Sequence, residues 1–535
     1  MKIIKDFLSE YKIPTLLAFI HWYTTTLLQI DRNIFTYETE TKYMIVIKIL
    51  YLFVLLISWN FVFFCRNQVR DNNDLYKRGI LIFSVYFSIL LAFLLILWPG
   101  TWSWDDIGIL RGILSYGSFV PWQHFLSGLY QAVLLQILPH PGGIILLQNL
   151  VISVCVAFSV VKLENAFQLY AIKNKYIDAL VKILPFLTPP VLIYQFSGYR
   201  MGIYVYLELV VLVCFICTCK DRKQWKITFC VFLGILIAIV SSWRSESLFY
   251  ILFFPLALIF VRKDVLFLWK KIICICISII LFIQINNLQN HCLENNNYQV
   301  ISMMGPYSAI VRAADYKEDK EDLEIINRVA DIDKILANPS HGAEDLYWAD
   351  AAYRDGYTTN EFKESVLAVV RLSLKYPKQV FLERWNMFIT ATGIKGNIWR
   401  VNNQSISLFE QDGDSSHDEW FAERGYFPSF KKLRAVLINL LDCNSPSGSQ
   451  IGCLRRIVWN AWIPMIVLVY AWFSFVRRKQ WYYLMICTAV IVRIPVVFLT
   501  EPAGWIMYLL SFYFLGYVFL IYKILVLVGR NKKNE

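Results

Sequence analysis

Charged side chains are scarce in this chain of 535 residues. Asp, Glu, Lys and Arg make up 17% of it, and hydrophobic residues make up 57%. Soluble globular domains carry about 25% charged and about 45–50% apolar residues, so this composition excludes an ordinary soluble enzyme. At about 20 apolar residues for each bilayer crossing, a dozen crossings would use roughly 240 residues and leave enough chain for one aqueous domain.

The sequence also lacks internal repeats, low-complexity tracts and heptads, which excludes a solenoid or a coiled coil. No small-residue cleavage site follows the first apolar stretch, so we expect no removable signal peptide. The net charge is +12, but the basic residues form short clusters between apolar runs, as the positive-inside rule requires. We therefore predict that the partner is a membrane lipid bilayer and that the chain binds no nucleic acid.

Eleven apolar runs have the length of a membrane-spanning helix. A twelfth run, 14–30, is weaker and carries His21 and the consecutive threonines 24–26, so it either crosses the membrane or lies flat on it. The predicted fold class is therefore an all-α polytopic membrane protein with about 11 to 12 transmembrane helices. The eleven runs are 44–64, 79–99, 143–161, 179–197, 201–219, 226–242, 246–262, 272–288, 456–475, 481–499 and 504–525.

Basic clusters occupy alternate connections between these runs. Placing them all in the cytoplasm of a cell-membrane protein puts both termini there and satisfies the positive-inside rule without exception. The segment 100–142 then lies outside, and we expect juxtamembrane helices in it because its apolar run 125–138 is too short to cross. We predict an N-terminal transmembrane module (1–288), a mostly helical extracytoplasmic domain (289–455), and C-terminal transmembrane helices with a cytoplasmic tail (456–535).

Several of the 12 cysteines lie within apolar runs, where cysteine behaves as a small hydrophobic residue. Cys443 and Cys453 instead fall in the extracytoplasmic domain. That compartment permits a disulfide between them, and two free thiols are the alternative.

An acidic pair, Asp105 and Asp106, follows the second confident span in a stretch that contains two tryptophans. Because adjacent carboxylates repel, one holds a proton or a cation binds there, and either state suits a general base or a metal-assisted site. The alternative is a solvated loop whose tryptophans anchor the membrane interface. We expect His124, in the same external segment, to lie near these carboxylates and to be either structural or a substrate contact.

Two short external loops each present an arginine at the depth of a lipid phosphate, Arg200 and Arg244. The planar guanidinium group matches phosphate oxygens. For Arg244 the alternative is an ion pair with Glu246 while the aliphatic stem packs in the apolar layer.

Ionisable residues also occur within the apolar runs themselves. Arg493 lies inside the run 481–499, about two helical turns from Glu501. A charge at that depth needs a partner or a wet cavity, so we predict a functional role for Arg493. Glu208 is a similar, weaker case.

These features together resemble the GT-C superfamily of integral-membrane glycosyltransferases, which use polyprenyl-phosphate sugars, and in particular members from low-GC Gram-positive bacteria. The resemblance rests on the acidic pair in the first long external loop, the juxtamembrane helices after it, the arginine-bearing loops and the large late external domain. The turn from Glu501 to Trp505 before a final aromatic span completes it.

The resemblance implies that a sugar moves from a polyprenyl-phosphate carrier to an envelope glycan or lipid acceptor on the outer face of the membrane. It implies that Asp105 or Asp106 deprotonates the acceptor, with a divalent cation, Mg²⁺ or Mn²⁺, held at Asp106. Developing negative charge on a leaving phosphate is stabilised by preorganised cations. The expected substrate-binding residues are His124, Arg200, Arg244, Glu246, Arg493 and Glu501.

Three other functions fit the same pattern. A polysaccharide polymerase or ligase, acting on a lipid-linked oligosaccharide, would also have many spans, external arginines and a large outer loop. A transporter or flippase for lipid-linked glycans typically has interrupted helices, and Pro185, Pro189 and Pro190 interrupt one run here. A non-catalytic scaffold would tolerate neutralisation of both Asp105 and Asp106.

Overall fold

The computed structural model describes most of the chain, with gaps between its segments. The described residues are 2–28, 41–102, 104–115, 119–120, 122–218, 224–261, 266–292, 298–339, 342–393, 430–443 and 453–534. Within these ranges the structure is helical and contains no β-strand, only one isolated bridge between Ala330 and Tyr353. The prediction of an all-α protein is therefore confirmed for the described residues.

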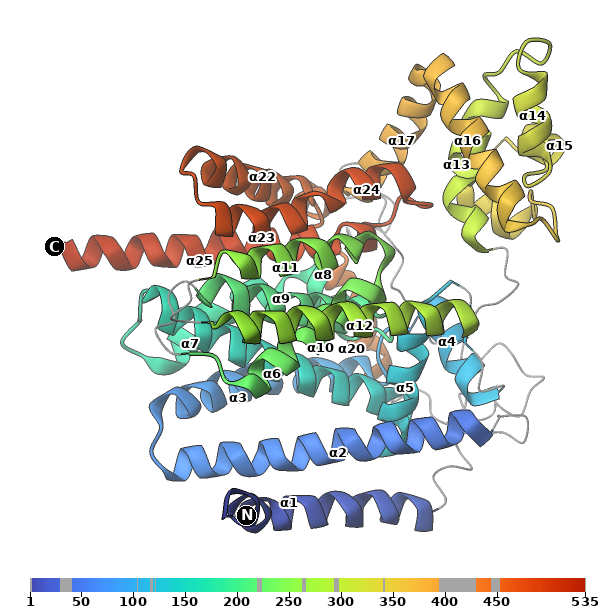
Figure 1. The fold of residues 1–535 in the computed structure, drawn as a ribbon. Coiled ribbons are helices and arrows are strands. Elements are labelled where there is room, and N and C mark those ends of the chain that lie inside the picture. Colours follow the sequence, from blue (N-terminus) through green and yellow to red (C-terminus); the bar gives the residue numbers. More distant parts are fainter. Residues whose placement is uncertain are drawn as a thin grey trace.

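The first half of the chain forms a bundle of long helices that run side by side (Figure 1). Its elements are α1 (Lys2–Leu27), α2 (Thr41–Arg70), α3 (Asp74–Leu97), α4 (Trp104–Ser115), α5 (Phe125–Ile137), α6 (Pro141–Phe167), α7 (Lys175–Ile183), η2 (Leu184–Leu187), α8 (Pro189–Gln195), α9 (Met201–Thr218), α10 (Ile227–Trp243), η3 (Ser245–Phe249), α11 (Tyr250–Ile259) and α12 (Leu268–Cys292).

A small domain, residues 298–380, follows α12 and has its own hydrophobic core. Its longest helix begins with a capping box, in which the Thr358 and Glu361 side chains bond to each other's backbone N–H groups and satisfy donors that the first turn leaves free. Its elements are η4 (Tyr298–Val300), α13 (Ile301–Val311), α14 (Lys320–Asn327), α15 (Ile332–Ala337), η5 (Asp345–Ala349), α16 (Thr359–Lys375) and the first part of α17 (Pro377–Ala391).

The chain then returns to the bundle. The end of α17 and the second half of α20 contribute side chains to the bundle core. Arg434 in α20 donates hydrogen bonds to Leu97 O and, at 2.8 Å, to Gly100 O. The C-terminal elements are α20 (Lys431–Leu441), α21 (Cys453–Val458), α22 (Trp462–Arg477), α23 (Trp481–Ile491), α24 (Arg493–Thr500), η7 (Ile506–Tyr508) and α25 (Leu510–Asn534).

Within the described residues, eight helices are long and apolar enough to cross a membrane, and a bent pair, α7–η2 with α8, raises the number to nine. From the sequence we expect 11 to 12 membrane-spanning helices. The difference arises because two expected spans, 226–242 and 246–262, correspond to the shorter apolar helices α10 and η3–α11, and because α1 is not among the eight. Each of the eleven apolar runs nevertheless lies on a helix or a helix pair.

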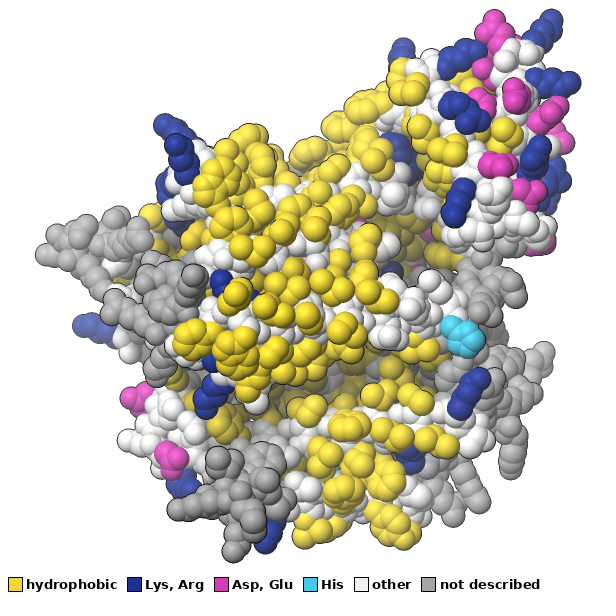
Figure 2. All heavy atoms as spheres, viewed as in Figure 1, with side chains coloured by type: hydrophobic (Ala, Val, Ile, Leu, Met, Phe, Trp, Pro, Cys, Tyr) yellow, Lys and Arg dark blue, Asp and Glu magenta, His cyan; other side chains and the backbone are white. Residues whose placement is uncertain are grey.

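Figure 2 shows hydrophobic side chains covering much of the visible face of the bundle, whereas Lys, Arg, Asp and Glu gather on the small domain. In the most apolar stretch of α2 and of α12, only 17% of the residues are buried within the protein. An apolar face that the protein leaves uncovered is suited to lipid. We conclude that the chain is a multi-pass membrane protein.

The bundle has two distinct ends, which we call the domain end, next to the small domain, and the opposite end. Both labelled termini lie toward the opposite end (Figure 1). There Arg78 contacts Glu164 at 2.7 Å, and Lys182 contacts both Glu164 at 2.7 Å and Asp178 at 2.8 Å. This ion-pair cluster ties α3, α6 and α7 together.

Cys443, just after α20, is a buried free thiol. The side chain of Cys453 lies outside the part of the chain that the structure describes. The Trp459 indole N–H donates to Leu441 O at 3.0 Å, and this contact joins the end of α20 to the start of the C-terminal helices.

Candidate functional site

Asp105 and Asp106 lie in the first turn of α4, where carboxylates favour the positive end of the helix dipole. Consecutive residues of a helix point in different directions, so the two side chains have different surroundings. Asp106 is fully buried and accepts a 3.0 Å hydrogen bond from the Ser197 hydroxyl. The same hydroxyl oxygen accepts from Tyr199 N at 3.1 Å. Asp106 therefore attaches α4 to the turn between α8 and α9.

Asp105 is only partly buried and accepts a hydrogen bond from the Tyr199 hydroxyl. Burial raises the pKa of Asp105, while the bond from Tyr199 and the nearby charge of Arg200 act in the opposite direction. An accessible carboxylate with a raised pKa is a better proton acceptor than an ordinary surface aspartate. Asp105 is thus the member of the pair that a substrate can reach.

Buried amide side chains hold the turn that carries Tyr199 and Arg200. Gln148 on α6 donates to Ser197 O at 3.0 Å, and Gln131 on α5 donates to Gly198 O at 3.1 Å. Gly198 is required here because a Cβ at this position would lie 2.4 Å from the Trp102 ring. Fixed backbone and close packing set the direction in which Arg200 leaves the turn.

Arg200 forms no ion pair within the described residues. Its Nη1 donates to Trp243 O at 3.2 Å, and its buried Nε has no hydrogen-bond partner. The neighbouring charges that act on it are those of Arg244 and Glu246. A guanidinium with unused donors beside a second guanidinium is a suitable site for a phosphate group.

Arg244 is buried and forms an ion pair with Glu246, which is the pairing that the sequence offered as an alternative to a phosphate site. Its Nη1 lies 2.7 Å from the sulfur of Met201, and its guanidinium lies 5.9 Å from the centre of the Tyr508 ring. The ion pair leaves Arg244 oriented beside Arg200, so that both arginines belong to one site.

Arg493 is fully buried at the start of α24 and forms an ion pair with Glu208 on α9. It also donates to the Tyr250 hydroxyl at 2.5 Å and to Ser511 Oγ at 3.3 Å, and its Nη2 lies 4.0 Å from Glu246. These partners come from α9, α11, α25 and η3. Arg493 therefore reaches the site through Glu246 and at the same time links four elements of the bundle.

His124 is the N-cap of α5: its Nδ1 accepts a 3.3 Å hydrogen bond from Leu126 N. Burial, and secondarily the charge of Arg200, lower the pKa of His124 to about 3. The imidazole is therefore neutral, with its proton on Nε2, and this atom is buried without a partner in the described residues. The charge of Arg200 acts on His124, whereas the expected proximity of His124 to the two carboxylates stays a prediction.

Glu501 has different neighbours from the other predicted site residues. It is 1% exposed, neither of its carboxylate oxygens has a hydrogen-bond partner in the described residues, and burial raises its pKa to about 9. The charges that act on it are those of Arg384 and Glu383 on α17. Arg384 Nη1 donates to Glu501 O at 2.8 Å, so this region joins α17 to the end of α24.

Sequence reasoning did not find Glu344 or Tyr298, which the small domain places beside Asp105. Burial raises the pKa of Glu344 to about 8, and the charge of Asp105 adds to the shift. The phenol of Tyr298 is within the electrostatic range of Asp105, Arg200 and Glu344. No local motif marks either residue, because their proximity depends on how the small domain packs on the bundle.

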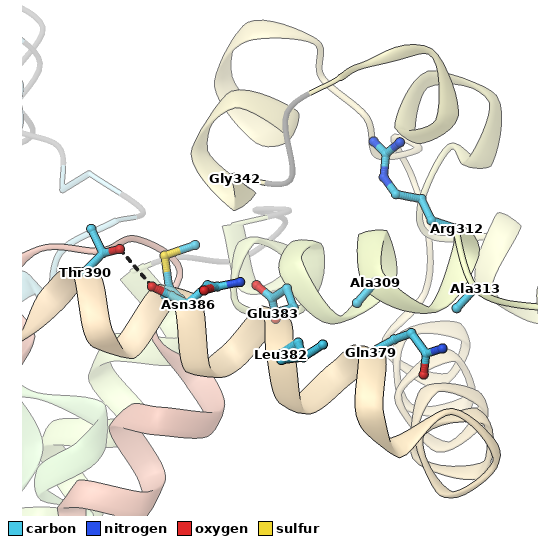
Figure 3. A pocket seen from close by; sticks show the side chains of 10 residues that line it. Ala309, Arg312, Ala313, Gly342, Gln379, Leu382, Glu383, Asn386 and Thr390 are labelled. Carbon is cyan, nitrogen blue, oxygen red and sulfur yellow. Dashed lines mark hydrogen bonds between the residues drawn. The ribbon is translucent and has the colours of Figure 1, made fainter. Parts of the chain in front are cut away.

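A cavity of about 550 Å³ lies between α13 and α17 of the small domain (Figure 3). Ala309 and Ala313 line one side, Leu382 and Asn386 line the other, and Thr390 Oγ1 donates to Asn386 O at 2.8 Å within α17. None of the predicted site residues lines it. In the described part of the chain no three His, Cys, Asp or Glu side chains come together as a metal site.

Comparisons with protein-family models, with curated proteins and with solved structures gave no match. The arrangement of Asp105, Arg200 and Arg244 is therefore the basis for a proposed function.

Proposed function

We propose that the protein is a membrane glycosyltransferase of the GT-C type. It would move a sugar from a polyprenyl-phosphate carrier to an envelope glycan or lipid acceptor on the outer face of the cell membrane, with both termini in the cytoplasm. The observation that carries the proposal is the position of Arg200, which has no ion-pair partner in the described residues, next to Asp105. A free cation for a phosphate and an accessible base for a hydroxyl are the two groups that this reaction needs.

In the proposed reaction, Asp105 accepts the proton of the acceptor hydroxyl. The hydroxyl oxygen then forms a bond to the anomeric carbon of the sugar, while the bond from that carbon to the phosphate oxygen breaks. The electron pair of the broken bond stays on the polyprenyl phosphate, and Arg200 with Arg244 stabilises the resulting charge. Attack opposite to the leaving group inverts the configuration at the anomeric carbon.

The bond from Tyr199 to Asp105 supports this role, because a fixed carboxylate loses little freedom when it meets the acceptor. Asp106, bonded to Ser197, holds α4 and the turn with Arg200 at a constant separation. We assign the base to Asp105 and a positioning role to Asp106.

A divalent cation remains part of the proposal. Mg²⁺ is commonly held by one or two carboxylates together with phosphate oxygens of the substrate, and Asp105 and Asp106 would supply the carboxylates. Because Asp106 is fully buried and bonded to Ser197, a cation would meet Asp105 first. The ion would neutralise phosphate charge.

One observation favours a transporter of lipid-linked glycans instead. The axes of the segments Lys175–Leu187 and Pro189–Gln195 differ by 81°, and broken helices are common in transporters. The bend leads directly into the turn with Ser197, Tyr199 and Arg200, so it also explains how these residues reach Asp105. A transporter would leave the donor chemically unchanged in detergent, because there is no membrane across which to move it.

The test compares cells that carry wild-type protein, Asp105→Asn or Asp106→Asn at equal membrane levels. Mass spectrometry measures the polyprenyl-phosphate-linked sugars, and sugar analysis measures the surface glycan. We expect Asp105→Asn to accumulate one lipid-linked sugar while the glycan loses that sugar. Extracted from these cells and mixed with envelope glycan and lipid from cells that lack the protein as acceptors, this lipid should be consumed by purified wild-type protein in detergent and not by Asp105→Asn. If wild-type protein leaves the lipid intact, the glycosyltransferase is excluded in favour of the transporter.

A further inference from the structure

An aromatic cluster lies where the small domain meets α4, and the proposed reaction does not use it. We define it by Trp122, Tyr298, Tyr347 and Trp348. The ring centre of Trp348 lies 4.8 Å from that of Tyr347, 5.7 Å from that of Trp122 and 6.2 Å from that of Tyr298. The cluster therefore joins residues of the small domain to the segment between α4 and α5.

Trp348 is 55% exposed, although Tyr347 beside it is only 8% exposed. Burying an indole is favourable. An exposed indole next to a buried tyrosine on the more polar domain therefore presents a surface for another molecule. The Trp122 ring is packed against α4, since a Cβ at Gly108 would lie 2.9 Å from it. The Trp122 indole Nε1 is buried and has no hydrogen-bond partner in the described residues. An unused donor in such a place indicates a polar ligand.

The aromatic cluster extends to Asp105, the proposed general base. Tyr298 is acted on by the charges of Asp105 and Glu344, and Glu344 directly precedes η5, which carries Trp348. Glu344 is half-buried, and its pKa of about 8 keeps it protonated at neutral pH. A neutral carboxyl group both donates and accepts hydrogen bonds. Aromatic side chains, a buried indole N–H and a neutral carboxyl group thus gather near Asp105.

This combination fits a saccharide. A sugar ring has an apolar C–H face that packs on an aromatic side chain and hydroxyl groups that need both donors and acceptors. An anion is a poorer fit, because Asp345 and Asp105 lie beside Glu344 and would repel it. The arginines that attract phosphate lie on other elements, on the turn after α8 and in the η3 region.

We propose that Trp348, Trp122, Glu344 and Tyr298 form the subsite that binds the acceptor as a saccharide and directs one of its hydroxyl groups to Asp105. This inference rests on the proposed function and names its acceptor class. It assigns the donor side of the reaction to the arginines of the bundle, and the acceptor side to the small domain together with Trp122.

The experiment measures binding without catalysis. The probe is polysaccharide released from the envelope of cells that lack the protein, since this material has not received the transferred sugar. Saturation-transfer NMR is recorded on the full-length protein in detergent, for the wild type, Trp348→Ala and the control Tyr316→Ala. Tyr316 is also an exposed aromatic residue of the small domain, but its charged neighbours are Asp333 and Arg312 rather than Asp105.

We expect the wild type and Tyr316→Ala to bind the polysaccharide equally and Trp348→Ala to bind it roughly tenfold more weakly. If Trp348→Ala aggregates, Trp348→Leu replaces it, because leucine keeps an apolar group and removes the ring. Binding of Trp348→Leu at the wild-type level overturns the inference, and so does a wild type that shows no saturation transfer.

The same samples separate this inference from the proposed function. Asp105→Asn should bind the polysaccharide like the wild type and still accumulate the lipid-linked sugar in cells. If Asp105→Asn accumulates no lipid while Trp348→Ala weakens binding, the proposed transfer reaction fails and the saccharide subsite stands. The reverse result removes the subsite and leaves the transfer reaction.

Discussion

The Tyr199 hydroxyl donates a hydrogen bond to Oδ2 of Asp105. This bond connects the start of α4 to the turn between α8 and α9, and it places Asp105 next to the residue that follows Tyr199, Arg200. Two groups with opposite chemical roles, a base and a cation, are thereby held on different elements at a fixed distance.

Replacement of Arg200 tests the phosphate site. Arg200→Gln removes the charge that we propose to stabilise the leaving phosphate, and a hydrogen bond to a charged group contributes about 1.5–3 kcal/mol. We expect kcat/KM for the lipid-linked sugar to fall roughly 10- to 100-fold. Arg200→Lys should lose less, because it keeps the charge and loses the planar fork. Equal activity of wild type and Arg200→Gln would place the phosphate elsewhere.

Substitutions of Asp106 test whether this residue positions α4 through Ser197 or acts as the catalytic base. Asp106→Asn keeps an oxygen that can accept from the Ser197 hydroxyl, whereas Asp106→Ala leaves that buried hydroxyl without this acceptor, at a cost of about 1–3 kcal/mol. We expect the apparent Tm in detergent to fall more for Asp106→Ala than for Asp106→Asn. The lipid-linked sugar should accumulate far less with Asp106→Asn than with Asp105→Asn. The opposite order would make Asp106 the base.

The buried ion pair of Arg493 and Glu208 gives a prediction about stability. Arg493→Met leaves Glu208 buried and uncompensated, and such a change typically costs about 3–5 kcal/mol. The double variant Arg493→Met with Glu208→Leu removes both charges and should recover much of the apparent Tm. If the single variant is as stable as the wild type but loses transfer, Arg493 serves the substrate and not the bundle.

The raised pKa of Glu344 predicts that the stability of the protein depends on the external pH. Its pKa is raised to about 8 from the usual 4.5, so the folded protein binds a proton that the unfolded chain releases. Stability from this group is fully present below about pH 4.5 and is lost as the pH rises through about 8. The apparent Tm of the wild type should therefore fall relative to that of Glu344→Gln over this range. Parallel curves for the two proteins would contradict the shift.

The same ionisation should affect transfer. Above about pH 8 a charged Glu344 adds a second negative charge beside Asp105 and can no longer donate a hydrogen bond to a sugar hydroxyl. We expect transfer to decline through this pH in the wild type and to change less in Glu344→Gln. The measurement is the initial rate of sugar transfer in detergent at each pH.

Much of the fold could be predicted from the sequence, because apolar runs of spanning length have few alternatives to a helix. The segment 100–142 indeed contains two short helices, α4 and α5. The sequence also indicated that Arg493 needs a partner and that Glu208 is unusual, but only the packing of α24 against α9 joins the two. The number of spans was less predictable, since α10 and η3–α11 are apolar but short.

The candidate site was only partly predictable for a related reason. Asp105 and Asp106 are adjacent in sequence and look equivalent there. In the structure, different side chains of the turn after α8 donate hydrogen bonds to them. Glu344 and Trp348 carry no local signal at all. Their relation to Asp105 follows from the docking of the small domain, which composition and spacing do not encode.

The central claim is that Asp105 takes the proton of a saccharide acceptor, and one comparison tests it most directly. Lipid-linked sugar and surface glycan are measured in cells with wild-type protein or Asp105→Asn at equal membrane levels and equal apparent Tm. A general base typically contributes about 10²- to 10⁴-fold in rate, so we predict that Asp105→Asn accumulates the lipid and that its glycan loses one sugar. A variant whose lipid and glycan both match those of the wild type would contradict the account.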